Sequence, residues 1–357
     1  MAQAHGPPAR RAALARGVLV FRLVSMASTA SHPEELLDEG ALPPGRMVSS
    51  YRVERVVGTG GMGSVYRASH ALAGRVVALK VMREDQLTQE RAVDRMMREA
   101  SILASVSHPG IPRFYECGIL DDGRPWIAME LIAGTSLSHR MQRELVAPDD
   151  VIDLVYDVAG VLAAAHERGV THRDLKPDNI FLTPDDPGYR VRVIDWGIAH
   201  AHAGSRFTNM NEAVGTPTYM SPEQARGGPT DGTCDVYGLG VVAYQALTGR
   251  APFLGATSVE ILVQHLNRPA PALAPRCPDA PYGLVELVEQ MLVKNHEERP
   301  SAADVQVALS RLRAETHRRI SGQQPALDRT DGVPLQMVEE RTATTAVIRA
   351  PRRANDD

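Results

Sequence analysis

The stretch Thr171-His-Arg-Asp-Leu-Lys-Pro-Asp-Asn179, followed after a predicted hairpin by Ile194-Asp-Trp-Gly197, is the most informative part of this chain. It lies in a half of the sequence where apolar residues recur at helical spacing. These stripes predict helices over residues 149–168, 233–248, 280–294 and 302–317. The chain from about residue 133 onward is therefore predicted to be mainly α-helical.

Upstream of this stretch the pattern is typical of strands. Apolar and polar residues alternate over 51–57, and the alternation resumes over 64–68 and 75–81. Two further strands are predicted over 113–117 and 126–132, on either side of the turn Asp121-Asp-Gly123. Residues 89–106 contain few helix breakers and have apolar positions at helical spacing. The region therefore predicts an antiparallel sheet with one helix packed on it.

A glycine-rich segment, Gly58-Thr-Gly-Gly-Met-Gly-Ser-Val65, separates the first two strands and fits the pattern G-x-G-x-x-G-x-V. Glycines without side chains let backbone N–H groups approach phosphate oxygens closely. Alone the signal is weak, because such a segment is often only a turn. The related dinucleotide-binding pattern should precede a helix, whereas a strand follows here.

Lys80 ends the segment Val77-Ala-Leu-Lys80 in the next predicted strand. A lysine among buried aliphatic residues must direct its ammonium toward a negative group, and phosphate is a natural partner. Glu99 on the following helix could reach the same ammonium. The alternative for either residue alone is a solvated surface side chain.

These motifs, taken in order with the His172-Arg-Asp174 and Asp195-Trp-Gly197 segments, resemble the signature set of protein kinases. Over residues 51–317 the chain looks like the bacterial branch of eukaryotic-like, Hanks-type serine/threonine kinases. The resemblance implies an α+β, bilobal protein kinase fold. Its N-lobe, residues 51–132, would be a small antiparallel β-sheet with one key helix, and its C-lobe, residues 133–317, would be larger and mainly α-helical.

The resemblance also implies roles for individual residues. Asp174 would orient the substrate hydroxyl and accept its proton, and Lys176 would steady the γ-phosphate of ATP. Lys80 would neutralise the α- and β-phosphates, with Glu99 fixing its position. Asn179 and Asp195 would hold Mg²⁺, a hard cation that their oxygens suit. Lys176 further indicates protein substrates with Ser or Thr hydroxyls rather than Tyr.

The predicted ATP-binding residues surround these groups. They are Gly58, Gly60, Gly61, Gly63, Val65, Ala78, Lys80, Glu130 and Ile132. Met129 would be the gatekeeper, and the backbone of residues 130–132 would bind adenine. For the apolar members, ordinary core packing explains the residue types nearly as well.

Other residues are predicted to regulate or support the site. Arg173 would pair with a phosphate on an activation segment over 195–223, where Thr208 is the favoured phosphorylation site and Thr216 would contact Asp174. Glu223 should pair with Arg299, and Asp235 should support the catalytic loop. Trp196, where phenylalanine is usual, could alter how the segment flips. A transient homodimer for trans-autophosphorylation is a further expectation.

Composition limits the partners, the cysteine chemistry and the cellular location that we expect for this chain. A net charge of −4 requires neither nucleic acid nor an anionic membrane as partner. The three cysteines lack C-x-x-C spacing and indicate reduced thiols. The apolar run over 17–26 is interrupted by Arg22 and is too short for a membrane helix, so no membrane anchor and a cytoplasmic location are expected. Residues 1–50 are predicted to be a flexible N-terminal arm and 318–357 a disordered C-terminal tail.

Two other functions compete with an active protein kinase. A pseudokinase would bind nucleotide or partners without transfer, but it usually lacks one of the residues corresponding to Lys80, Asp174, Asn179 and Asp195. A kinase of small molecules could share the base and the metal ligands. The segment over 215–223, which resembles a peptide-docking loop, argues against that alternative.

Overall fold

The computed structural model describes residues 40–60, 63–83, 97, 100–183, 190–196 and 217–320, with side chains as far as residue 314. The chain divides into two units, Met1–His317 and Arg318–Asp357, and the description below concerns the first. Its last helix, α8, continues to Ile320.

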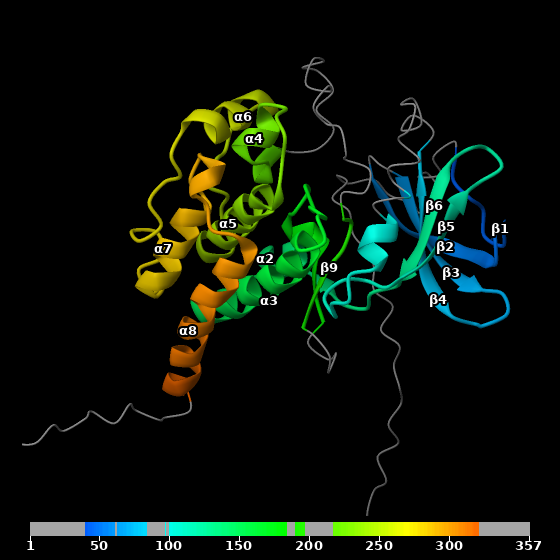
Figure 1. The fold of residues 1–357 in the computed structure, drawn as a ribbon, viewed down its shortest axis with the longest axis horizontal. Coiled ribbons are helices and arrows are strands. Elements are labelled where there is room, and N and C mark those ends of the chain that lie inside the picture. The colour runs from blue at the N-terminus through cyan, green and yellow to red at the C-terminus, as the bar shows by residue number, and fades with distance from the viewer. Residues whose placement is uncertain are drawn as a thin grey trace, which may run out of the picture. The chain divides into compact units, whose positions relative to one another are not determined.

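The N-terminal part of the fold is an antiparallel sheet of six strands in the order β1-β2-β3-β4-β6-β5 (Figure 1). The strands are β1 (Met47–Val48), β2 (Tyr51–Gly60), β3 (Gly63–His70), β4 (Val76–Met82), β5 (Phe114–Ile119) and β6 (Pro125–Glu130). Val65 of β3 lies directly opposite Lys80 of β4. Because residues two apart on a strand share a face, Val65, Ala78 and Lys80 face the same side of the sheet. The predicted antiparallel sheet is confirmed.

The opposite face of this sheet carries a core that begins earlier in the chain than predicted. Val77, Leu79 and Val81 of β4 pack there with Leu42, which is 7% exposed. The backbone N–H of Leu42 donates to the hydroxyl of Tyr66 at 2.9 Å. Residues 40–50, which were predicted to belong to a flexible arm, therefore contribute strand β1 and a buried leucine to the fold. Residues 1–39 lie outside the described part.

The second half of the fold is mainly helical, as predicted. Its helices are α2 (Leu137–Met141), α3 (Pro148–His166), α4 (Pro222–Ala225), α5 (Gly232–Thr248), α6 (Ser258–Asn267), α7 (Tyr282–Met291) and α8 (Ala302–Ile320). A small antiparallel sheet lies beside them, formed by β7 (Thr135–Ser136), β8 (Ile180–Leu182) and β9 (Val191–Val193). Single 3₁₀ turns occur at Pro177–Asn179, Pro217–Tyr219 and His296–Glu298.

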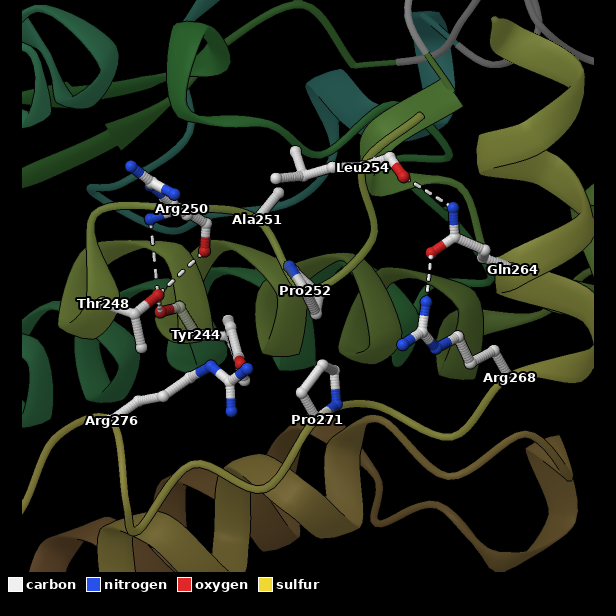
Figure 2. A pocket seen from close by; sticks show the side chains of 10 residues that line it. All are labelled: Tyr244, Thr248, Arg250, Ala251, Pro252, Leu254, Gln264, Arg268, Pro271 and Arg276. Atoms are coloured by element: carbon white, nitrogen blue, oxygen red, sulfur yellow. Dashed lines mark hydrogen bonds between the residues drawn. The ribbon is translucent and has the colours of Figure 1, made fainter. Parts of the chain in front are cut away.

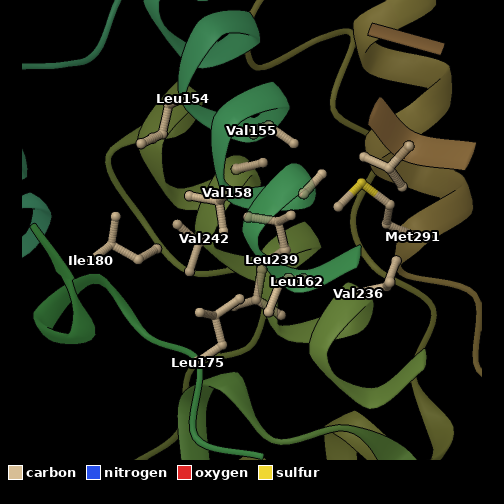
Figure 3. Close-up of a cluster of buried hydrophobic side chains, with 14 of the residues drawn as sticks. Leu154, Val155, Val158, Leu162, Leu175, Ile180, Val236, Leu239, Val242 and Met291 are labelled. Atoms are coloured by element: carbon tan, nitrogen blue, oxygen red, sulfur yellow. The ribbon is translucent and has the colours of Figure 1, made fainter. Parts of the chain in front are cut away.

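Helices α3 and α5 form the centre of the helical core. Figure 3 shows Val158 and Leu162 of α3 meeting Leu239 and Val242 of α5, with Met291 of α7 beside them. All five side chains are fully buried. Burial of a leucine- or valine-sized side chain contributes roughly 1.5–3 kcal/mol each, so this contact fixes the two helices rigidly. The loop between α3 and β8 is thereby held against the start of α5.

Helix ends explain the small differences from the predicted boundaries. Helix α3 begins at Pro148, since proline is tolerated in the first turn, and the chain turns at Gly169 with φ 73°. Helix α7 is shorter than the predicted 280–294. Helix α6 was not predicted, although the Thr257 side chain caps it by accepting a hydrogen bond from the backbone N–H of Glu260. Most of the helix predicted over 89–106 lies outside the described residues, but 100–104 are helical as expected.

Among the described residues, no helix combines the length and the apolar character required to cross a membrane.

Candidate functional site

Asp235 in the first turn of α5 fixes the loop that follows α3. Its carboxylate accepts hydrogen bonds of 2.7 Å from the backbone N–H groups of His172 and Arg173, and lies 2.8 Å from His166 Nε2. Burial raises the pKa of Asp235, but the hydrogen bonds and charges of His166 and His172 together outweigh burial and leave that pKa below its usual value. The prediction that Asp235 supports this loop is confirmed.

The loop brings three of the predicted site residues together. Lys176 Nζ lies 2.7 Å from Asp174 Oδ2, and Asn179 Nδ2 donates to the backbone oxygen of Asp174 at 2.7 Å. The side chains of Asp174 and Lys176 are 33% and 35% exposed, so both remain open to a substrate. Because Asn179 uses its nitrogen toward the loop, its Oδ1 can face a cation.

Lys80 from β4 reaches Asp195, which lies beyond β9. Lys80 Nζ is 2.9 Å from Asp195 Oδ1, and the two side chains are 15% and 39% exposed. The neighbouring Lys80 lowers the pKa of Asp195, so this carboxyl remains ionised. Asp195 has φ 55°, a left-handed conformation that costs a non-glycine residue about 1–2 kcal/mol. The sequence did not predict this pair, and Glu99, the predicted partner of Lys80, lies outside the described residues.

Trp196 anchors the residues around Asp195. Its indole N–H donates to the backbone oxygen of Val193 at 2.8 Å, and the ring is 4% exposed. The ring centroids of Trp196 and His172 are 5.0 Å apart, and His172 Nε2 lies 2.9 Å from the oxygen of Ile194. Trp196 therefore binds the Asp195 segment to the loop that bears Asp174. Gly197, Thr208 and Thr216 lie outside the described residues.

The glycine-rich turn has two kinds of glycine. A Cβ on Gly63 would collide with the backbone oxygen of Val81, so close strand packing alone requires this glycine. Gly58 and Gly60 have open space where a Cβ would lie, so their backbones are accessible to a ligand. Gly61 lies outside the described residues. Among the described glycines of this turn, Gly58 and Gly60 therefore have the open space that a phosphate contact requires.

Part of the backbone that was predicted to bind adenine is already hydrogen-bonded within the protein. Glu130 N donates to the oxygen of Arg113 at 2.8 Å and so is not available to a base. The backbone N–H of Ile132 has no hydrogen-bond partner among the described residues. Ala78 is 8% exposed and Val65 is half-buried, on the sheet face that carries Lys80. Within the described part of the chain, Ile132 N–H is thus free to donate to a ligand.

The oxygen donors suit a hard divalent cation. Asp195 offers a carboxylate and Asn179 an amide oxygen, a ligand set in which phosphate oxygens and water complete the shell that Mg²⁺ prefers. Among the described residues there is no group of three or more His, Cys, Asp or Glu side chains in a metal-binding arrangement. The residues present therefore fit a metal ion that arrives together with a phosphate ligand.

Helix α4 links the site to the rest of the helical core. Gln224 Nε2 donates to the backbone oxygen of Arg173 at 2.7 Å. Its neighbour Glu223 forms the predicted ion pair with Arg299, with Nη1 to Oε1 at 2.7 Å, and this pair is confirmed. Sequence reasoning missed Gln224, although it completes a capping box with Ser221, three residues before it.

Comparisons with known proteins agree with this geometry. A family model described as "Protein kinase domain" matches residues 51–308. Serine/threonine-protein kinase pkn3 of Myxococcus xanthus is 40% identical over 263 residues, which cover 71% of this chain and 48% of that protein. Serine/threonine-protein kinase PknA of Mycobacterium tuberculosis is 36% identical over 250 residues, covering 69% of this chain and 57% of that protein. The chain spans about half the length of the curated relatives it matches.

A solved structure gives the same result for the fold. The crystal structure of the Mycobacterium tuberculosis PknI kinase domain matches with a TM-score of 0.62 at 28% identity, covering 76% of this chain and 99% of that one. The resemblance drawn from the sequence and the predicted bilobal fold are confirmed.

Proposed function

The chain belongs to the protein kinase domain family, and we propose that it transfers the γ-phosphoryl group of ATP to Ser or Thr hydroxyls of proteins. The observation that supports this most strongly is the placement of Asp174 within 2.7 Å of Lys176, with both side chains about one third exposed. A carboxylate can then accept the proton of an incoming hydroxyl while the adjacent ammonium neutralises charge on the transferred group.

Lys80, Asn179 and Asp195 would bind the rest of the nucleotide. In the structure Lys80 pairs with Asp195, and we propose that it turns its ammonium toward the phosphates of ATP when the nucleotide binds. The Asp195 carboxylate and the Asn179 oxygen would then hold Mg²⁺, which supplies positive charge between the phosphates. Glu99 would replace Asp195 as the partner of Lys80.

ATP would occupy the sheet face that carries Lys80. Val65 and Ala78 would contact the adenine ring, and Ile132 N–H would donate to it. Gly58, Gly60 and Gly61 would cover the phosphates through their backbones. Glu130 would contribute only through its backbone oxygen, because its N–H is bonded to Arg113.

Regulation and location are part of the same proposal. We propose autophosphorylation within 195–223, with Thr208 as the acceptor and Arg173 as the partner of its phosphate, through a transient homodimer. A cytoplasmic location is supported by three cysteines that are all free, and by the dependence of the reaction on ATP. Mass spectrometry of the protein incubated with Mg-ATP would locate the modified hydroxyls.

The test compares the wild type with Asp174→Asn, with Asp178→Asn as the matched control. Asp178 lies on the same loop and accepts a hydrogen bond from Ser138, so its substitution changes the same functional group outside the proposed chemistry. We expect phosphate incorporation into a generic protein acceptor to fall by about 10²–10⁴-fold in Asp174→Asn and to remain within about twofold in Asp178→Asn.

Two outcomes would favour the alternative functions. ATP binding by the wild type without any transfer would indicate a pseudokinase. Transfer to a small-molecule acceptor but not to protein would indicate a small-molecule kinase.

A further inference from the structure

A pocket of about 390 Å³ lies in the helical half, between the end of α5, helix α6 and the loop that leads to α7 (Figure 2). Three arginines line it, Arg250, Arg268 and Arg276, together with Tyr244 and the prolines Pro252 and Pro271. Cavities of a few hundred Å³ suit a ligand of several heavy atoms. None of these residues belongs to the proposed phosphoryl-transfer site.

Two of the arginines are held by neutral groups. Arg268 Nη1 donates to Gln264 Oε1 at 3.4 Å, and Gln264 in turn donates to the oxygen of Leu254 at 2.6 Å (Figure 2). Arg276 Nη1 donates to the oxygen of Ala272 at 3.2 Å. Within the described part of the chain, none of the three guanidinium groups forms an ion pair with a carboxylate. Their positive charge is therefore available to a ligand.

Neighbouring groups offset only part of this charge. Helix α5 ends at Thr248 and α6 ends at Asn267, and each helix C-terminus carries about half a negative charge. The carboxylate of Glu289, whose charge acts on Tyr244, uses Oε1 to accept the N–H of Leu273 at 3.1 Å. Three guanidinium groups, less the two helix ends and the Glu289 carboxylate, leave about one positive charge. A phosphate monoester suits these groups better than a single carboxylate does, because its three oxygens can accept charge-assisted hydrogen bonds from more than one guanidinium group.

The floor of the pocket offers a hydroxyl and apolar surface. Tyr244 is 2% exposed as a residue, and its hydroxyl has no hydrogen-bond partner among the described residues. Figure 2 shows its tip beside Arg276. Figure 2 shows Pro252 and Pro271 near each other between Arg276 and Arg268, where their apolar rings suit the backbone next to a phosphorylated residue. This combination suits a peptide better than a free ion.

Helix α6 also connects the pocket with the proposed acceptor region. It packs against the turn Pro217–Tyr219 and α4, which lie at the end of the activation segment predicted over 195–223. A protein bound at the pocket would thus lie along the same helix that borders this segment.

We propose that this pocket binds a phosphorylated Ser or Thr of a protein segment, with Arg250, Arg268 and Arg276 on the phosphate oxygens. The proposal rests on the proposed kinase function in one respect: the bound segment belongs to a protein acceptor that already carries a phosphate elsewhere. The binding itself requires neither ATP nor Asp174.

The test measures binding of fluorescein-labelled alanine–glycine peptides to the full chain by fluorescence polarisation. The peptides carry one central phosphothreonine, threonine or aspartate. We expect the phosphothreonine peptide to bind the wild type at least about tenfold more tightly than the other two, because guanidinium groups form bidentate charge-assisted bonds to phosphate. Inorganic phosphate should compete with it.

The variant R250Q/R276Q should lose about tenfold or more of this affinity, whereas R311Q, which changes an exposed arginine of α8, should bind as the wild type does. Arg276→Lys should lose part of this affinity, since lysine keeps the positive charge but lacks the planar guanidinium that can bond phosphate through two N–H groups. Equal binding of the phosphothreonine and aspartate peptides, or full binding by R250Q/R276Q, would overturn the proposal.

The outcome is separable from that of the kinase assay. R250Q/R276Q should phosphorylate an unphosphorylated generic acceptor at the wild-type rate. Asp174→Asn should bind the phosphothreonine peptide normally while losing transfer. If the wild type transfers no phosphate but still binds this peptide selectively, the kinase proposal fails while the proposal that the pocket binds phosphopeptides stands.

Discussion

Asp235 Oδ1 accepts a hydrogen bond of 2.7 Å from the backbone N–H of Arg173, a residue that has φ 64°. A left-handed conformation costs a non-glycine residue about 1–2 kcal/mol, so Arg173 needs a partner that stabilises it. Asp235 is 1% exposed and can supply this stabilisation, because its hydrogen bonds form away from water. The geometry of Asp174, the next residue, therefore depends on a side chain from α5.

Asp235→Asn should weaken both the fold and the proposed transfer. The amide keeps the shape of the carboxylate but places an N–H₂ group against a backbone donor, so one buried donor loses its acceptor. We expect the free energy of unfolding to fall by about 1–3 kcal/mol, measured by urea denaturation. Phosphate incorporation should fall by at least about tenfold as the Asp174 loop relaxes.

Asp231→Asn is the matched control for this substitution. Asp231 caps the same helix by accepting from Thr233 N, and asparagine caps a helix about as well as aspartate. Its cost should remain below about 0.5 kcal/mol. Equal costs at the two positions would mean that Asp235 has no special role in fixing the loop.

Arg299→Lys should destabilise the protein although the charge is kept. All five guanidinium N–H groups have acceptors: the carboxylate oxygens of Glu223 at 2.7 and 2.8 Å, and the backbone oxygens of Val293, Thr233 and Lys294. Lysine offers three donors and cannot span these acceptors. We expect a loss of about 3 kcal/mol in unfolding free energy, as for a broken buried pair. Arg311→Lys, at an exposed position, should change it by less than about 0.5 kcal/mol, and a similar loss at both sites would contradict the assignment.

The contacts that could be predicted from the sequence are those of residues inside short motifs. Glu223, Arg299 and Asp235 each stand in a recognisable segment, and the structure confirms their predicted contacts. The Lys80–Asp195 pair joins residues 115 positions apart, and the sequence assigned each of them to a different partner. Only the folded path of the chain brings these two charges together.

The arginine pocket was not predictable for a related reason. Arg250 follows α5, Arg268 follows α6 and Arg276 lies in a loop, so no periodicity or motif connects them. Their placement around one pocket depends on how α5 and α6 pack. The same applies to Leu42, whose backbone N–H donates to a hydroxyl that lies 24 positions further along the chain.

Tyr66→Phe should reveal the contribution of the segment that precedes the sheet. The Tyr66 hydroxyl is the acceptor for the buried N–H of Leu42, and Tyr66 is 1% exposed. Removing it leaves a buried donor unsatisfied, so we expect a cost of about 1–2 kcal/mol in thermal or urea unfolding. Tyr282→Phe, at a residue that is 79% exposed, should be neutral. A neutral Tyr66→Phe would show that residues 40–46 add no stability through this bond.

His265 of α6 predicts a pH dependence of stability. It is fully buried between Tyr237 and Phe253, with its Nδ1 2.9 Å from the Tyr237 hydroxyl, and Lys294 Nζ donates to the same hydroxyl at 3.0 Å. Burial, with the nearby charge of Lys294, lowers the pKa of His265 to about 4. The unfolded chain therefore binds a proton more readily than the folded protein does, between about pH 6.5 and pH 4.

Stability rises with pH wherever the unfolded state binds more protons, so acidification through this window should destabilise the fold. We expect His265 to contribute a loss of about 3 kcal/mol in unfolding free energy between about pH 7 and pH 4. His265→Phe keeps a ring in the cavity without a titrating group, and its unfolding free energy should therefore fall less steeply over this range. His139→Gln, at an exposed position, should retain the wild-type slope. Urea unfolding at a series of pH values would measure the slopes, and parallel curves for the wild type and His265→Phe would show that His265 keeps its ordinary pKa in the folded protein.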